Sequence, residues 1–105
     1  MSEPAQGEVW WGETPDAKGR PYLVLTRDQA IPVLRTIVAA PVTRTIRNIP
    51  TEVALGSGEG LPIESVAAMD SLLTIPKTML VRRMGALDRS RRAELCASLV
   101  AMADC

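Results

Sequence analysis

Residues 80–103 read LVRRMGALDRSRRAELCASLVAMA, and within this stretch the hydrophobic pattern changes from that of a strand to that of a helix. Leu80 to Met84 is a short apolar and basic segment typical of a β-strand, and Gly85 ends it. Asp88 is a good helix N-cap residue, and apolar positions recur at helical spacing beyond it. We therefore predict a strand, a turn and a C-terminal helix whose apolar stripe contains Leu95, Cys96, Leu99, Val100, Met102 and Ala103.

Short strand-like segments separated by turn residues fill the chain before this point. The first two are Gly7–Trp11 and Arg20–Arg27, with the turn-rich loop Gly12–Gly19 between them. Pro21 restricts the second segment to the start of a strand or to a sheet edge. The apolar run 33–42 is typical of a strand covered on both faces. Further strands are predicted at Thr51–Leu55, Ser65–Met69, Leu72–Ile75 and Leu80–Met84, with a polar, basic loop at 43–50 and a flexible turn at 56–60.

This order of elements defines the expected fold class. Many short strands followed by one helix predict a mainly β protein with some α, a small SH3-like curled antiparallel sheet or barrel. The chain has 105 residues, of which 47% are hydrophobic and 23% charged, so we expect a single domain over residues 1–105. The start of the chain has no signal peptide and no apolar run is long enough to cross a bilayer, so we expect a cytoplasmic protein without a membrane partner.

The composition excludes several kinds of enzyme. The chain contains no histidine, which removes Ser-His-Asp and Cys-His mechanisms and the commonest zinc ligand. Its two cysteines, Cys96 and Cys105, have no further ligands at metal-binding spacing. We interpret Cys96 as a core residue of the helix and Cys105 as a terminal thiol, and we expect neither a metal nor another cofactor.

The charges are segregated along a chain whose formal net charge is zero. Residues 1–17 hold four acids and no base, residues 18–47 hold six bases and only Asp28, and residues 48–70 again hold four acids and no base. A basic region of this kind can bind a polyanion such as a nucleic acid. Alternatively, strands pair the acidic and basic segments across the sheet.

Five short motifs occur in the order and spacing of one known family. With the terminal helix, they make the chain resemble the MazF/PemK toxins, whose fold is CcdB/PemK-like. The motifs are Gly7-Glu8-Val9-Trp10, Gly19-Arg20-Pro21-Tyr22, Ala40-Pro41-Val42-Thr43, Pro50-Thr51-Glu52-Val53, and the Gly60-Leu61, Ser65 and Asp70 positions.

The resemblance implies a homodimer of SH3-like barrels that cleaves single-stranded RNA at short sequences and is neutralised by a cognate antitoxin. Carried over by motif, the catalytic positions fall on Arg20 and Thr43. The chain departs from some members in lacking a histidine near the site and in having Arg44 where others have Ser or Thr.

RNA cleavage is chemically feasible with these residues because the 2′-OH of RNA supplies the nucleophile. Arg20 would hold the scissile phosphate through two hydrogen bonds and Thr43 would donate another, giving a 2′,3′-cyclic phosphate and a 5′-OH. Glu13 is the preferred general base, with Asp16 as an alternative. The predicted RNA-binding residues are Lys18, Arg27, Arg44 and Thr45.

Each of these residues also has a structural interpretation. Arg20 could pair with Glu13 or Asp16, and Thr43 could cap its strand through a bond to the backbone. Trp10 and Trp11 should point to opposite faces, one into the core and the other towards a base or a dimer partner, although an interface could bury both.

Two other function classes are consistent with the same fold. One is a toxin that poisons DNA gyrase without cutting RNA, but that branch ends in an exposed aromatic tail and this chain ends in Ala103-Asp104-Cys105. The other is a non-enzymatic SH3-like binding module.

Overall fold

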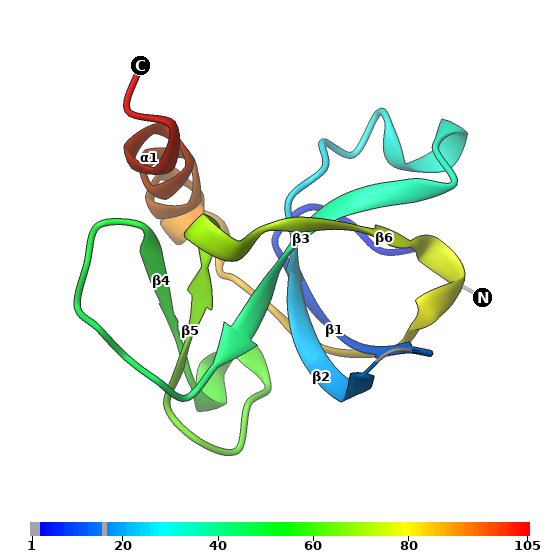
Figure 1. Ribbon diagram of the computed structural model, residues 1–105, viewed down its shortest axis with the longest axis horizontal. Coiled ribbons are helices and arrows are strands. Elements are labelled where there is room, and N and C mark those ends of the chain that lie inside the picture. Colours follow the sequence, from blue (N-terminus) through cyan, green and yellow to red (C-terminus); the bar gives the residue numbers. More distant parts are fainter. Residues whose placement is uncertain (1–2, 16) are drawn as a thin grey trace.

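The computed structural model describes residues 3–15 and 17–105, which form one curled antiparallel sheet and a C-terminal helix (Figure 1). This confirms the predicted fold class. In the described residues the elements are β1 (Glu8–Thr14), β2 (Ala17–Val24), β3 (Thr36–Thr43), β4 (Glu52–Leu55), β5 (Ser65–Ala68), β6 (Leu73–Pro76), β7 (Leu80–Ala86) and α1 (Arg92–Ala103).

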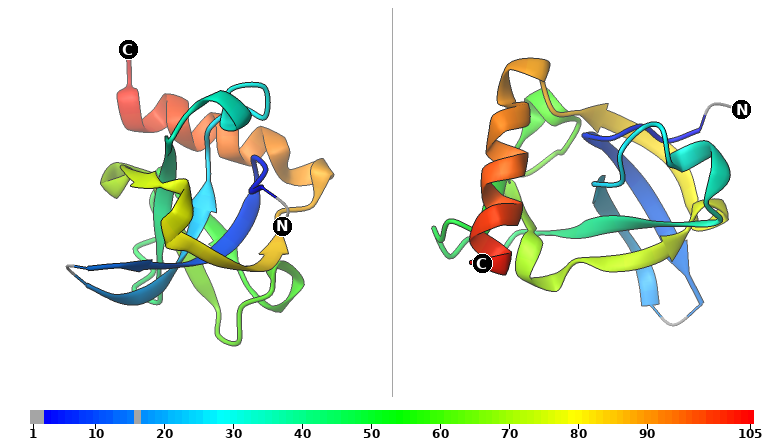
Figure 2. Two further views of the ribbon diagram at one scale, coloured as in Figure 1. Left: turned by 90° about the vertical axis from the view of Figure 1, so that its right-hand side faces the viewer. Right: turned by 90° about the horizontal axis from the view of Figure 1, so that it is seen from above.

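Strand β3 joins the two parts of the sheet. The strand order is β4-β5-β3-β2-β1-β7, and β6 also pairs with β3. Residues 36–39 of β3 pair with β6, residues 39–41 pair with β2, and Val42 and Thr43 pair with β5. Because β3 changes partners along its length, the sheet curls into a half-barrel. Figure 2 shows α1 lying across one end of it, on the side away from the β1–β2 hairpin.

The core has two parts because successive side chains of a strand point to opposite faces. Val9 and Leu23 belong to a cluster that Leu95 of α1 also joins. Trp10 and Tyr22 belong to a second cluster inside the curl of the sheet. Trp10 is therefore buried within its own chain, at 6% exposure, whereas Trp11 points to the other face and is half-buried.

The β1–β2 connection is much shorter than the predicted loop Gly12–Gly19. Strand β1 continues to Thr14 and β2 begins at Ala17, so most of that segment is a hairpin. Turn-forming residues do not prevent strand pairing when the partner strand supplies hydrogen bonds, which a local pattern cannot show. Pro21 lies within β2 but outside the stretch that pairs with β3, so the strand is locally an edge there, as predicted.

The apolar run 33–42 is not one strand. Ile31–Val33 forms a 3₁₀ turn and β3 begins only at Thr36. Val33 is 79% exposed, so its hydrophobicity does not reflect burial. The prediction was wrong at this point because Pro32 lies at the start of the turn, where its fixed φ favours a helical turn over a strand.

The helix buries only part of the predicted apolar stripe. Leu95 and Ser98 are buried, and Leu99 and Met102 pack beside them, but Cys96 is exposed. The interpretation of Cys96 as a core residue was therefore wrong, and Val100 and Ala103 are also on the exposed side. Ser98 is the one buried helix residue that the apolar pattern did not include. In the described residues no helix is long and apolar enough to cross a membrane.

Arg91 anchors the start of the helix. Its Nη2 donates to the carbonyl oxygen of Ala54 in β4 at 2.8 Å and forms a salt bridge with Glu94 at the same distance. Its Nη1 lies 3.5 Å from Oε2 of Glu59. These contacts explain why a basic residue is tolerated at the positive end of the helix dipole. Asp88 caps the preceding turn by accepting from the Ser90 amide, as predicted.

Candidate functional site

The β1–β2 hairpin carries an aromatic side chain whose orientation is fixed. The indole of Trp11 packs so closely on Gly19 that a Cβ at residue 19 would overlap the ring. The indole Nε1 donates a hydrogen bond to Oε2 of Glu13 over 3.3 Å. Glu13 is exposed, so its carboxylate faces solvent beside the hairpin.

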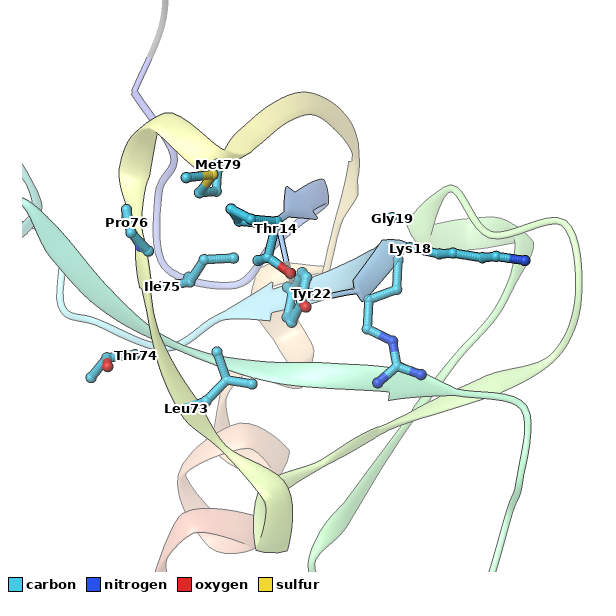
Figure 3. A pocket seen from close by; sticks show the side chains of 11 residues that line it. Thr14, Lys18, Gly19, Tyr22, Leu73, Thr74, Ile75, Pro76 and Met79 are labelled. Carbon is cyan, nitrogen blue, oxygen red and sulfur yellow. The ribbon is translucent and has the colours of Figure 1, made fainter.

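The larger of two pockets beside the hairpin has a volume of about 720 Å³ and opens between the hairpin and β6 (Figure 3). Tyr22 and Ile75 are buried and give it an apolar floor. Arg20 lines it from the hairpin, and Figure 3 shows the side chain of Lys18 extending away from that floor. This pocket thus combines an apolar interior with a basic rim.

The second pocket, of about 380 Å³, lies on the other face of the hairpin. Trp11 and Pro21 line it from β1 and β2, and Thr43 and Arg44 line it from the end of β3. Arg82 lines it from β7, directly across from Trp11 in the strand register. Arg20 and Pro21 thus belong to different pockets because neighbouring residues of a strand point to opposite faces.

Thr43 bonds the backbone that follows its strand, as its structural interpretation predicts. Its Oγ1 accepts a hydrogen bond from the Thr45 amide at 3.1 Å. A hydroxyl that accepts one bond can still donate its own proton. The carboxylate of Glu52 fixes the rest of this loop by accepting from the amides of Arg47 and Asn48, both at 3.0 Å. Arg44 and Thr45 are therefore exposed on an ordered segment.

The sheet brings Arg20 and Thr43 to the same end of adjacent strands. Tyr22 pairs with Pro41, so continuing the antiparallel register by two residues sets Arg20 opposite Thr43. The pairing itself stops at Tyr22, and β3 turns to pair with β5 at Val42. Arg20 consequently faces the larger pocket and Thr43 the smaller one, with Pro21 between them.

The other predicted site residues lie either beside the two pockets or far from them. Lys18 and Arg44 line a pocket, and Glu13 and Thr45 are hydrogen-bonded to residues that do. Arg27 follows the opposite end of β2, seven residues and about 20 Å from Arg20 along an extended chain, and lines neither pocket. Asp16 lies outside the described residues.

Arg82 was missed by the sequence analysis. It is exposed and reaches the smaller pocket only because β7 pairs with β1. The consecutive pair Arg82-Arg83 in a strand indicates only that the two side chains point to opposite faces of the sheet. It does not indicate which of the two faces a pocket. Arg83 is the one paired with a carboxylate, with Nε 2.8 Å from Oε2 of Glu8.

The basic residues that pair with carboxylates lie outside the two pockets. Within residues 3–15 and 17–105, Lys77, Arg83 and Arg91 form salt bridges. In the same part of the chain none is formed by Lys18, Arg20, Arg44 or Arg82. Among the described residues no group of three Cys, Asp or Glu is placed to hold a metal ion.

The fold defines the class of protein. Toxin MazF-mt6 of Mycobacterium tuberculosis has the same fold, with a TM-score of 0.85 and 33% identity over 92% of this chain and 96% of that chain. A mycobacterial endoribonuclease solved with its cognate antitoxin also shares it, with a TM-score of 0.84 and 24% identity over 96% of this chain and 95% of that one. The half-barrel with its terminal helix is thus the fold of MazF toxins.

Sequence comparison identifies the family. A probable endoribonuclease, MazF5 of Mycobacterium tuberculosis strain H37Rv, is 42% identical over 103 residues, which is 97% of this chain and 94% of that protein. The model of the family described as PemK-like, MazF-like toxin of type II toxin-antitoxin system matches residues 5–103. The chain belongs to this family, and the resemblance seen in its motifs is confirmed.

Proposed function

We propose that this chain is a toxin that cleaves single-stranded RNA at short sequences without a metal ion. The observation that carries the proposal is the placement of Arg20 and Thr43 at the same end of adjacent strands, where Arg20 lines one pocket and Thr43 the other, so that a phosphate bound at the strand ends would meet both side chains. The naming of its relatives as endoribonucleases supports RNA as the substrate.

Each residue has a role that suits its exposure. Arg20 binds the scissile phosphate through its planar guanidinium and stabilises the charge that grows on it during attack by the 2′-OH. Thr43 donates its hydroxyl proton to a phosphate oxygen. Glu13 accepts the proton of the 2′-OH, because its carboxylate is exposed beside the hairpin. As the 2′-oxygen attacks, the bond from phosphorus to the 5′-oxygen breaks and that oxygen takes a proton from solvent, so the products are a 2′,3′-cyclic phosphate and a 5′-OH.

The remaining basic side chains bind the RNA backbone. Lys18 lies on the side of Arg20, and Arg44 with Thr45 lies on the side of Thr43. Arg27 lies three residues beyond the end of β2, too far from Arg20 to reach the same phosphate, so it is not included in the proposed cleavage site.

The partners follow from the family. We propose that the toxin works as a homodimer in the cytoplasm, where its RNA substrate is found, and that a cognate antitoxin blocks it. An acidic segment with apolar side chains would match the basic rims and apolar floors of the pockets.

Incubation with single-stranded RNA in excess EDTA tests this proposal. Undiminished cleavage with cyclic phosphate ends is expected, because guanidinium and hydroxyl groups replace the metal in neutralising charge. Loss of cleavage on chelation, restored by Mg²⁺ or Zn²⁺, would contradict it. Intact RNA together with inhibition of DNA gyrase would indicate the gyrase poison instead, and neither effect would indicate a binding module.

A further inference from the structure

The smaller pocket contains an aromatic surface that the folded chain already holds in place. Trp11 is half-buried, and its ring rests on Gly19 while its Nε1 is bonded to Glu13. Such a side chain loses little freedom when a flat ligand stacks on it. Aromatic rings held in this way are the usual contact for unpaired nucleobases.

The charges around this pocket favour a polyanion that continues beyond it. Arg82 lies on one side, in β7, and Arg44 lies on the other, at the end of β3. Strands β7 and β3 are three strand spacings apart in the sheet, so the two arginines are anchored about 14 Å apart. No carboxylate is found among the described residues that line the pocket. Phosphates on both sides of a bound base would therefore meet an arginine.

The remaining walls suit the base itself. Pro21 and Met84 are apolar, and Pro62 and Ile63 line the pocket from the segment before β5. Its volume of about 380 Å³ lies in the range of small-molecule sites. The hydroxyl of Ser65, which donates to the Ile63 carbonyl at 2.9 Å, still has lone pairs to accept from a base.

We propose that this pocket binds one nucleobase of the RNA, stacked on Trp11, with the phosphates on either side of that nucleoside held by Arg44 and Arg82. The inference rests on the proposed function, because Thr43 lines the same pocket and would place the base next to the scissile phosphate. Trp11 would then be a determinant of the cleavage sequence.

Binding without cleavage tests the inference separately from the activity. The probes are 2′-O-methyl oligonucleotides of A, C, G or U alone, which lack the nucleophile, and an oligomer of the same length without bases. Tryptophan emission should be quenched by at least one base-bearing probe and unchanged by the abasic one. Trp10 is buried and provides a constant background.

Variants of Trp11 distinguish stacking from a structural role. Trp11→Ala should weaken binding of the quenching probe about 5- to 150-fold and leave binding of the abasic oligomer unchanged. Trp11→Phe should recover most of the lost affinity, because it keeps an aromatic face. Thermal unfolding of both variants checks that the fold is intact.

Arg82 and Arg83 form a matched pair for the phosphate contacts, since Arg83 points away and is bound to Glu8. Arg82→Ala should reduce the slope of log affinity against log salt by about 0.7. Arg83→Ala should leave the slope nearly unchanged.

Equal loss of affinity for both probes in Trp11→Ala would overturn the inference. So would emission that no probe quenches, as expected if a second copy of the chain or a protein partner covers the pocket. If the probes quench Trp11 but wild-type protein leaves RNA intact, the subsite stands and the proposed cleavage function fails.

Discussion

At the scale of single residues, the proposed chemistry depends on two side chains that reach solvent from a rigid sheet. Arg20 is exposed beside a buried tyrosine, and Thr43 combines a structural bond to Thr45 with a hydroxyl proton that is free to donate. The motifs predicted both positions because they are local in sequence. They could not predict Arg82, which joins the pocket only through the pairing of β7 with β1.

Replacing Arg20 should affect turnover far more than binding. Arg20→Ala should raise the activation free energy of cleavage by about 2.7 to 4 kcal/mol, because it removes a donor to the growing phosphate charge. Arg20→Lys should restore only part of the rate, since it lacks the planar pair of donors. Single-turnover cleavage and binding of an uncleavable oligonucleotide separate the two effects, and Arg27→Ala is the control for loss of one positive charge.

Replacing Thr43 should distinguish its hydroxyl from its shape. Thr43→Val removes both the bond from the Thr45 amide and the donated proton, so cleavage should fall strongly. Thr43→Ser keeps both and should retain most of the activity. If Arg20→Ala and Thr43→Val both fold and cleave at nearly the wild-type rate, the proposed site is wrong.

Glu8 should contribute to stability as a carboxylate. Burial raises its pKa, but hydrogen bonds from Trp10, Arg83 and the Ala5 amide together hold the pKa below its ordinary value of 4.5. A carboxyl whose pKa is lowered by folding stabilises the folded state above its unfolded pKa, and this contribution is lost as the pH falls through the folded pKa.

Glu8→Gln should therefore lower the free energy of unfolding by about 1 to 3 kcal/mol at neutral pH. The difference from wild type should shrink as the pH falls below 4.5, the ordinary pKa of the group. Urea unfolding at several pH values measures it. Glu64→Gln, at an exposed position, is the control, and an equal effect of both variants would contradict the assignment.

At the scale of elements, local patterns predicted which segments are strands but not where each begins or which face it buries. The order of strands and the terminal helix followed from alternation and helical spacing. The start of β3 did not, because an apolar run continues through the exposed Val33. The apolar stripe of the helix was predicted too wide, because Cys96 is apolar but exposed, whereas the buried Ser98 is polar.

Arg91 should be the main polar anchor between α1 and the sheet. Arg91→Ala removes the bond to the Ala54 carbonyl and the pairing with Glu94 and Glu59, so the free energy of unfolding should fall by about 1 to 2 kcal/mol. Arg89→Ala, two residues before Arg91 and at an exposed position, should change it by less than about 0.5 kcal/mol. Chemical denaturation of both variants compares them, and equal stabilities would show that Arg91 is not an anchor.

At the scale of the whole molecule, we expect two copies to associate. Trp10 cannot contribute to that interface, since its own chain buries it. The exposed apolar side of α1, formed by Cys96, Val100 and Ala103, remains available. Val100 is 70% exposed, and we expect the second copy to cover it.

Light scattering at micromolar concentration should therefore give twice the mass of one chain. Val100→Lys should shift the equilibrium towards the monomer, because it places a charge in the apolar contact. Val33→Lys, at an equally exposed valine outside the helix, should not. A wild-type monomer would contradict the proposed homodimer.

The way the pockets are assembled makes each of them depend on segments far apart in the sequence. The lining of the larger pocket runs from Thr14 to Met79 and that of the smaller one from Trp11 to Met84. A product of interrupted synthesis that stops before Met79 therefore lacks part of both linings, and we expect such a fragment to be harmless to the cell that makes it.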